Sequence, residues 1–311
     1  MSTLADKRFV LVTGKGGVGK TTVCAAEALS LAAQGKRVLV AMCNAKERLS
    51  TMLGSAPVGS EVIEVSPGVS AVNMVPEQAL AEYGALVLHS RMAYKALFEN
   101  RVVKAFLRAV PGMQEWAMLG KAWWHTTETR PDGSPKYDVV ILDAPATGHG
   151  IDMLRVPKVI LDVVPTGLLR RDAERAWHLF QDEKSTCIVV VTLPEEMPTT
   201  ETVELAGALS ELGLRVGRIV VNCVLPKLFS DAERASFEGL PEWQRDAGPG
   251  AALSPAERVV YEAKDRAARE HIQAESLQRL TRALPVKPSF LPLLFDDAAT
   301  PAALRELSKR V

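Results

Sequence analysis

The sequence FVLVTGKGGVGKTT, residues 9–22, passes from an apolar run straight into a glycine-rich turn that carries two lysines. Within it, GKGGVGKT at residues 14–21 fits the pattern G-x-x-x-x-G-K-[ST]. The run before the turn predicts a buried strand, and the alanine-rich segment after it predicts a helix. That is the context in which this pattern binds phosphate. The stretch therefore predicts a nucleotide-binding loop in an α/β fold.

The loop residues have separate expected roles. The glycines permit backbone conformations that bring N–H groups close around phosphate oxygens, and the following helix points its positive end at the same anion. Lys20 would reach the β- and γ-phosphates of ATP, and the Thr21 hydroxyl would bind Mg²⁺. The predicted nucleotide-binding residues here are Gly14, Lys15, Gly16, Gly17, Val18, Gly19, Lys20, Thr21 and Thr22.

Further apolar runs predict the rest of a sheet. They are rich in valine and isoleucine and do not alternate with polar residues, which is typical of strands buried on both faces. Helical patterns separate them, so we expect a doubly wound, mostly parallel sheet of the P-loop NTPase type. The runs lie at residues 37–42, 137–145, 186–193 and 217–225, and we expect an extra strand at 70–75 and a last one within 289–297.

Two helical segments interrupt this alternation. Residues 76–131 predict a helical insertion, and residues 151–183 predict a second helical stretch. The sheet resumes at Tyr137 directly after the insertion. We therefore expect residues 1–311 to form a single P-loop ATPase domain.

Composition narrows the function classes. Lysine plus arginine and aspartate plus glutamate number 37 each, so the formal net charge is zero and supplies no basic surface for nucleic acid or anionic lipid. The first apolar run is too short for a signal segment, and the tail at 301–311 is a weak candidate for a membrane anchor. The four cysteines form no CxxC pair. We expect a cytoplasmic protein with no nucleic-acid partner and no direct membrane anchor.

Several motifs identify the family that the chain resembles. KGGVGKT, Lys15–Thr21, resembles the signature of the deviant-Walker P-loop ATPases. LDAPATGHG, residues 142–150, resembles the second switch of one branch, the arsenite-pump and tail-anchored-protein-targeting ATPases. Segments similar to this branch continue at residues 189–202, 219–225 and 291–295, so the resemblance covers nearly the whole chain.

The resemblance implies a dimer that closes around ATP. In this family the extra lysine, here Lys15, reaches across a two-fold interface to the partner's nucleotide, and Glu201 contributes to the dimer-facing network. Such a cation offsets charge developing on the phosphoryl group. The remaining implied contacts are Asp143 to Mg²⁺ through water, Gly148 to the γ-phosphate, and Asn222 and Pro292 to adenine.

One position departs from the family pattern. The first switch reads roughly S-T-D-P-A-H-N-L-S in the family, and MCNAKERLS at residues 42–50 stands there in this chain. Asn44 thus occupies the position of the catalytic aspartate, and a neutral amide can orient a water but accepts its proton poorly. We expect tight ATP binding with slow or absent hydrolysis. A shifted alignment would place Glu47 in this role instead. The predicted catalytic residues are Lys15, Lys20, Asn44 and Asp143.

Two functions remain open at this point. Methionines and aromatic residues in the insertion suit a groove for a client with a hydrophobic helix, although they could equally be the insertion's own core. Asn44 instead favours an ATP-sensing regulatory or scaffolding subunit that pairs with a paralogue, so homodimer and heterodimer both stay open. Arsenite transport is disfavoured, because the four cysteines lack that branch's motif context. The candidate groove residues are Met92, Phe98, Phe106, Met113, Trp116, Met118, Trp123 and Trp124.

Overall fold

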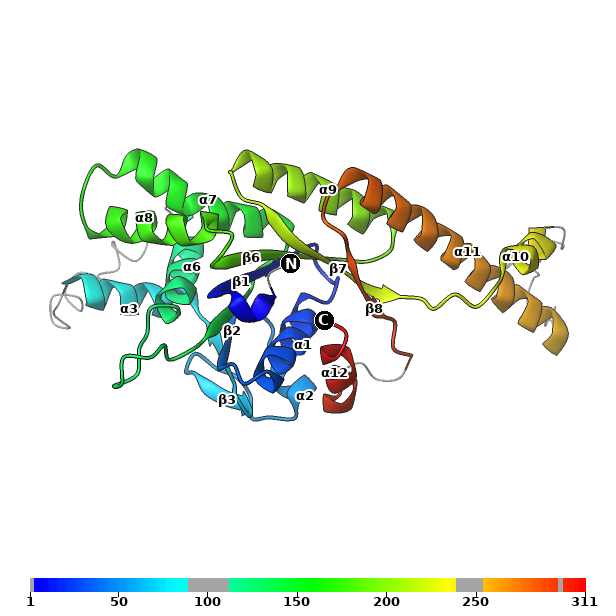
Figure 1. The fold of residues 1–311 in the computed structure, drawn as a ribbon, viewed down its shortest axis with the longest axis horizontal. Helices are drawn as coiled ribbons and strands as arrows, with labels where there is room; N and C mark the ends of the chain where they lie inside the picture. The colour runs from blue at the N-terminus through cyan, green and yellow to red at the C-terminus, as the bar shows by residue number, and fades with distance from the viewer. Residues whose placement is uncertain (1–2, 89–111, 239–253, 296–298) are drawn as a thin grey trace.

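A computed structural model describes residues 3–88, 112–238, 254–295 and 299–311 of the chain. These residues form one eight-stranded sheet with helices on both faces (Figure 1). The strand order is β3-β4-β2-β5-β1-β6-β7-β8. The strands are β1 (Phe9–Thr13), β2 (Val38–Cys43), β3 (Ile63–Ser66), β4 (Val69–Met74), β5 (Val139–Asp143), β6 (Thr186–Thr192), β7 (Val216–Val224) and β8 (Ser289–Pro292).

All neighbouring strands in this order run parallel except β3 and β4, which are antiparallel. The prediction of a doubly wound, mostly parallel sheet is therefore confirmed. The described helices are η1 (Leu4–Asp6), α1 (Lys20–Ala33), α2 (Leu49–Leu53), α3 (Pro76–Leu88), α6 (Met113–His125), α7 (Thr147–Val163), α8 (Leu168–Gln181), α9 (Glu196–Glu211), α10 (Asp231–Glu238), α11 (Pro255–Ala283) and α12 (Pro301–Ser308).

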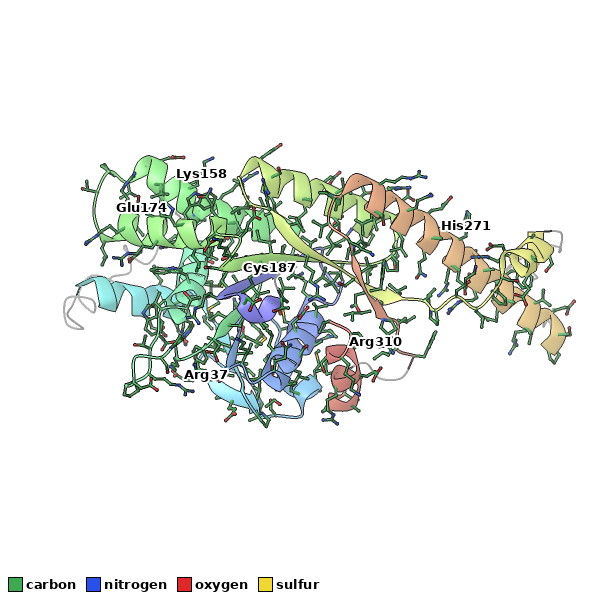
Figure 2. All side chains as sticks on the ribbon, viewed as in Figure 1. Arg37, Lys158, Glu174, Cys187, His271 and Arg310 are labelled. Atoms are coloured by element: carbon green, nitrogen blue, oxygen red, sulfur yellow. The ribbon has the colours of Figure 1, made fainter. Side chains whose placement is uncertain are left out.

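The helices form two layers. Helices α1, α2 and α12 cover one face of the sheet, and α6, α7, α8 and α9 cover the other (Figure 1). The second layer carries exposed charged side chains such as Lys158 on α7 and Glu174 on α8, and His271 is exposed on α11 (Figure 2). Helix α11 packs on α9 near its C-terminal end, and its N-terminal half extends past the edge of the sheet (Figure 1).

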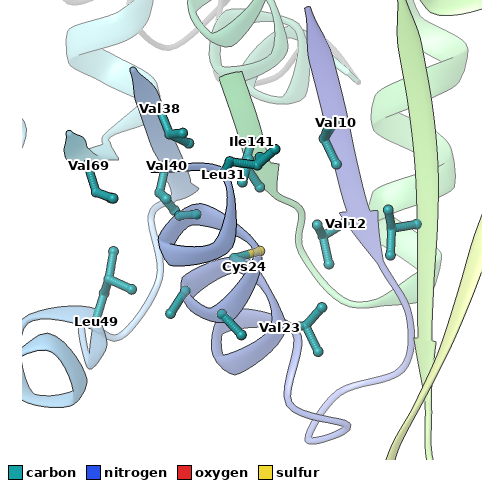
Figure 3. Close-up of a cluster of buried hydrophobic side chains, with 14 of the residues drawn as sticks. Val10, Val12, Val23, Cys24, Leu31, Val38, Val40, Leu49, Val69 and Ile141 are labelled. Carbon is teal, nitrogen blue, oxygen red and sulfur yellow. The ribbon is translucent and has the colours of Figure 1, made fainter. Parts of the chain in front are cut away.

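The core consists of one main cluster on each face. Val10 and Val12 of β1 point toward α1 and pack with its residues, including Cys24 (Figure 3). Phe9 and Leu11 belong to the cluster on the opposite face. Successive strand residues point to opposite faces, so a strand covered on both sides needs apolar residues throughout. This is why β1 reads as an uninterrupted apolar run.

Some elements differ from the expectation. The antiparallel strand β3 lies at the sheet edge and was not predicted, because only Val65 of its four residues is buried and the segment carries little apolar signal. A short helix, α10, follows β7, and Sequence analysis assigned no helix there. The last strand, expected within residues 289–297, covers Ser289–Pro292. The second helical stretch is two helices, with Gly167 at φ +119° before α8.

The described part of the insertion is helical up to His125, and residues 126–131 are not helical. Helix α3 follows β4, and α6 precedes β5. Trp116 and Met118 of α6 are buried in the core cluster on the sheet face that α6–α9 cover. Met113 and Trp123 pack against this cluster. Of the remaining candidate groove residues, Met92, Phe98 and Phe106 lie outside the described residues. No helix within the described ranges combines the length and the apolarity that crossing a bilayer requires.

Candidate nucleotide-binding site

The glycine-rich loop lies near the middle of the sheet. It joins the end of β1, which pairs with β5 and β6, to the start of α1. Gly14 has φ +144°, and a Cβ atom there would lie 2.2 Å from the carbonyl oxygen of Val191. Gly19 has φ +91°, and a Cβ atom there would lie 2.3 Å from Nδ2 of Asn222. Only glycine fits these two positions, because both the conformation and the space exclude a side chain.

Asn222 of β7 supports the glycine-rich loop by a hydrogen bond to its backbone. It is buried, and its Nδ2 group donates a 3.0 Å hydrogen bond to the carbonyl oxygen of Val18. Pro292 lies on the adjacent strand, in register with Val224. The two residues that we expected at the adenine ring are therefore brought to neighbouring strands. The structure adds a loop-supporting role for Asn222, and adenine recognition stays a prediction.

The Lys20 side chain folds back over the glycine-rich loop. Its Nζ atom donates hydrogen bonds to the carbonyl oxygens of Gly14 (3.1 Å) and Lys15 (3.0 Å). Burial lowers the pKa of Lys20, and the nearby Asp143 carboxylate opposes this shift. A partly desolvated ammonium group beside backbone N–H groups is suited to bind a phosphate anion.

Thr21 and Asp143 meet at the start of α1. The Thr21 hydroxyl donates a 2.5 Å hydrogen bond to Oδ2 of Asp143, the last residue of β5. Asp143 is buried, which raises its pKa, while the Thr21 hydroxyl and the Lys20 ammonium act in the opposite direction. A hydroxyl and a carboxylate are the oxygen donors that Mg²⁺ prefers. These side chains therefore fit the predicted metal role.

Lys15 points to a different partner. Its Nζ atom lies 2.6 Å from Oε1 of Glu201 on α9, and the two side chains remain about one-third exposed at 34% and 30%. The structure thus brings together the two residues that the resemblance placed in the dimer-facing network. The ion pair forms within one chain, so Lys15 must leave Glu201 before it can reach a partner's nucleotide. Partly exposed pairs of this kind contribute little stability.

The segment after β2 places Asn44 at the surface. Asn44 is exposed and has φ +45°, and its N–H group donates a 2.8 Å hydrogen bond to the carbonyl oxygen of Met74. Asn73 of β4 holds the next residue: its Oδ1 atom accepts from the Ala45 N–H group (3.0 Å), and its Nδ2 atom donates to the Ala45 carbonyl (2.9 Å). Sequence analysis missed Asn73, although an asparagine within the apolar run VSAVNM is a signal.

Glu47 is engaged locally. Its two carboxylate oxygens accept hydrogen bonds from the Ser50 N–H group (2.7 Å) and the Ser50 hydroxyl (2.6 Å). Glu47 thereby caps the first turn of α2. The geometry gives Glu47 a structural role at the start of α2, and the catalytic assignments of Asn44 and Glu47 both stay predictions.

The second switch lies beside the loop. Between β5 and α7, Ala146 would be 3.8 Å from a Cβ atom built on Gly16. Gly148 is exposed in the first turn of α7, with open space where a Cβ atom would point. The Thr13 hydroxyl, at the end of β1, is buried and has no hydrogen-bond partner in the described part of the chain. Sequence analysis did not identify Thr13, whose polar group stands at the point where β1 meets the loop.

Helix α11 holds the segment that follows Asn222. The Gln273 side chain bonds both the N–H group (2.8 Å) and the carbonyl oxygen (3.0 Å) of Leu225. Glu270 accepts a 2.9 Å hydrogen bond from the Leu228 N–H group. The end of the predicted base-recognition strand is thereby fixed to α11.

Comparison with known proteins shows the family of the chain. The family model described as anion-transporting ATPase matches residues 7–166 and 168–245, and the chain belongs to this family of ATPases. Among individual relatives, ATPase BagA of Mycobacterium tuberculosis is 30% identical over 230 residues, which cover 72% of this chain and 67% of that protein.

Pump-driving relatives are longer. The arsenical pump-driving ATPase of Acidiphilium multivorum is 28% identical over 256 residues, covering 76% of this chain and 42% of that protein. An arsenical pump-driving ATPase of Escherichia coli is 28% identical over 237 residues, covering 70% and 40%. The matched segment thus spans about two-fifths of these two relatives.

Proposed function

We propose that this chain is a nucleotide-switch ATPase that binds Mg²⁺–ATP in its glycine-rich loop, closes as a dimer around it and hydrolyses it slowly. The observation that carries the proposal is the meeting of Thr21 with Asp143, with Lys20 lying over the loop beside them. Family membership supports ATP as the nucleotide. The type is that of the arsenite-pump and tail-anchored-protein-targeting ATPases.

Binding uses groups that already face the loop. Lys20 exchanges the Gly14 and Lys15 carbonyl oxygens for β- and γ-phosphate oxygens, a charge-assisted interaction that is stronger than its neutral counterpart. Thr21 and Asp143 hold Mg²⁺, which neutralises charge on the phosphates when bound. Asn222 and Pro292 flank adenine, and Gly148 responds to the γ-phosphate.

Hydrolysis is slow in this proposal because Asn44 replaces a carboxylate. An amide orients the attacking water but does not take its proton, and general-base catalysis contributes roughly 10² to 10⁴ in rate. The exposed position of Asn44, fixed by the Met74 carbonyl and next to the Asn73 clamp, supports its access to bound substrate.

Dimer closure depends on Lys15. When Lys15 leaves Glu201, its ammonium group reaches the partner's nucleotide and offsets charge there. The dimer is a homodimer or a heterodimer with a paralogue. The Asn44 substitution favours a second candidate function, an ATP-sensing regulatory or scaffolding subunit that acts with such a paralogue in the cytoplasm.

A hydrophobic-helix client remains a proposal for the helical insertion. Trp124 is 38% exposed and supports an apolar contact surface, whereas Trp116 and Met118 are committed to the core. ATP-dependent retention of a protein with an apolar tail segment tests this part, and retention that ignores ATP contradicts it.

Calorimetry with Mg²⁺–ATP, light scattering and phosphate release test the proposal together. We expect saturable binding, a shift from monomer to dimer and little phosphate release. Lys20→Ala should weaken binding by roughly 10- to 100-fold, because a hydrogen bond to a charged group contributes about 1.5–3 kcal/mol. Lys15→Ala should keep binding and lose the dimer.

Lys184→Ala is the matched control, because this lysine is exposed and lies in a turn before β6. It should leave binding and dimerisation unchanged. Absence of heat on adding Mg²⁺–ATP to the folded protein would contradict the whole proposal, and a nucleotide-independent dimer would contradict the closure step alone.

A further inference from the structure

A pocket of about 280 Å³ lies between α3, α6 and α8, away from the glycine-rich loop. These three helices occupy the end of the molecule opposite the projecting half of α11 (Figure 1). Three indole rings from α6 line the pocket: Trp116, Trp123 and Trp124. None of the predicted nucleotide-binding residues is among the lining residues of the described chain.

Helix periodicity creates the floor of this pocket. Trp116, Gly120 and Trp124 are four residues apart, so they follow one another along one face of α6. A Cβ atom on Gly120 would lie 3.7 Å from Cε2 of Trp116, an ordinary contact distance. The backbone therefore does not require glycine here, and glycine in a helix interior costs about 1 kcal/mol relative to alanine. Its effect is to leave a notch between the two indoles.

The walls provide apolar contact and one inward-facing cation. Leu168 of α8 and Ala79 of α3 lie across from the indoles. Lys121 is ion-paired to Glu82 of α3, with 2.9 Å between Nζ and Oε1. The Lys121 side chain is only 8% exposed, whereas that of Glu82 is 53% exposed. The Lys121 ammonium group is therefore part of the pocket wall, and the Glu82 carboxylate lies on the solvent side of the ion pair.

The difference in exposure between Lys121 and Glu82 indicates that the pocket would favour a negatively charged ligand. A solvent-exposed carboxylate contributes little to an ion pair, so a bound carboxylate can take its place at Lys121. Arg175 on α8 adds a second cation to the lining, and Asp172 adds a second acid one turn earlier. The pocket therefore suits a single negative charge better than two.

The volume of the pocket and its indole lining indicate the size and the ring type of the ligand. A cavity of about 150 Å³ in another protein accepts benzene, so about 280 Å³ accommodates two fused rings. Indoles pack on such rings in offset or edge-to-face arrangements. We propose that the α3–α6–α8 pocket binds a small planar aromatic carboxylate, with its rings in the Gly120 notch and its carboxylate on Lys121.

The test uses the full chain and 2-naphthoate as the probe. Saturation-transfer NMR and calorimetry should show binding with a Kd on the order of 0.1 mM, which is typical of a fragment of this size. The neutral alcohol 2-naphthalenemethanol and the cation 2-naphthylmethylammonium should each bind at least about fivefold more weakly, because they lose the charged contact with Lys121.

Matched variants locate the site. Gly120→Leu fills the notch and should reduce affinity more than about tenfold, whereas Gly120→Ala should change it less than about threefold, because only one methyl group is added. Lys121→Gln should weaken 2-naphthoate about tenfold and abolish its advantage over the alcohol. Trp124→Ala, at an exposed position, provides a second test should Gly120→Leu fail to fold.

Mg²⁺–ATP affinity serves as a control and should be unchanged in Gly120→Ala and Lys121→Gln. The melting temperature should not fall in Gly120→Ala, because alanine is favoured over glycine in a helix interior by about 1 kcal/mol. No saturable binding up to about 5 mM probe, or unaltered affinity in Gly120→Leu and Trp124→Ala, would overturn the site. Equal binding of the alcohol or the ammonium analogue would overturn the carboxylate assignment. These outcomes are independent of the proposed ATPase function.

Discussion

Thr21 and Asp143 stand 122 positions apart in the chain, and the hydroxyl of the first donates a 2.5 Å hydrogen bond to the carboxylate of the second. The contact joins the first turn of α1 to the carboxyl end of β5, across the β1–β5 pairing. The two oxygen donors expected for Mg²⁺ are therefore side by side before nucleotide binds. In the proposed function, slow hydrolysis follows instead from Asn44, the position at which the sequence departs from the family pattern.

Asn44→Asp should restore a general base. Aspartate tolerates the left-handed conformation at φ +45° nearly as well as asparagine, so the backbone can stay as it is. We expect phosphate release to rise by at least about 100-fold with little change in ATP affinity, because the carboxylate acts on the water and not on the nucleotide. Unchanged turnover in a variant that still binds ATP and dimerises would contradict the role of this position. Asn44→Ser is the matched control and should stay slow.

Asn73 should act as a positioning residue for the same segment. Asn73→Asp replaces the donor that binds the Ala45 carbonyl with a second acceptor, so the clamp loses one bond and gains repulsion. We expect a loss of about 1–3 kcal/mol in the free energy of unfolding, measured by urea titration.

The kinetic effect distinguishes positioning from stability. In an Asn44→Asp background, the Asn73 change should lower kcat several-fold at constant KM, measured well below the unfolding midpoint. Equal changes in kcat and KM, or a change in stability alone, would assign Asn73 to folding only. Ser70→Ala, on the same strand, supplies the control.

Gly14 and Gly16 form a matched pair in the loop. A Cβ atom on Gly14 would lie 2.2 Å from a backbone oxygen of β6, whereas the nearest atom to a Cβ on Gly16 is 3.8 Å away. Gly14→Ala should therefore displace the loop and abolish ATP binding, with a fall in melting temperature. Gly16→Ala should leave the melting temperature within a few degrees of the parent. Similar melting temperatures for the two variants would contradict the close contact at Val191.

Glu27 should make stability depend on pH. It is buried on α1, with its Oε1 atom 2.7 Å from Nη1 of Arg218 on β7. Burial raises the pKa of Glu27 to about 7, even though Arg218 opposes the shift. The folded state then keeps a proton that the unfolded state releases near pH 4.5. Stability should fall as pH rises from about 4.5 to 7 and level off above, by up to about 3 kcal/mol from this group.

Glu27→Gln removes the titrating group and retains an acceptor for Arg218. The difference in unfolding free energy between parent and variant should therefore change across pH 4.5 to 7 and be constant from pH 7.5 to 8.5. A difference that stays flat from pH 4.5 to 8.5 would show that Arg218 keeps Glu27 ionised. Glu64→Gln, on the edge strand β3, is an exposed control.

Much of this fold could be predicted from the sequence, because strands buried on both faces of the sheet require long apolar runs. Val189, Val190 and Val191 are fully buried in β6 and could not alternate with polar residues. The edge strand β3 lacks this constraint, so its pattern is weak. The glycine-rich loop was predictable for a related reason, since the close contacts of Gly14 and Gly19 admit no other residue.

Contacts between distant side chains were less predictable. Lys15 and Glu201 were expected in one network through family resemblance, and only the structure pairs them within one chain at a separation of 186 positions. Asn73 binds the backbone of Ala45, which any residue type would offer, so no partner side chain marks the interaction. The second role of Asn222, as a support for Val18, was hidden for the same reason.

The clamp between Gln273 of α11 and Leu225 ties the end of β7, which carries the predicted adenine contact Asn222, to a helix that extends past the edge of the sheet. Gln273 engages both the donor and the acceptor of one residue, so sliding the helix along its axis breaks two hydrogen bonds at once. We therefore expect a displacement of α11 along its axis to shift the backbone three residues after Asn222. A partner bound to the outer turns of α11 would in that case act on the predicted adenine position.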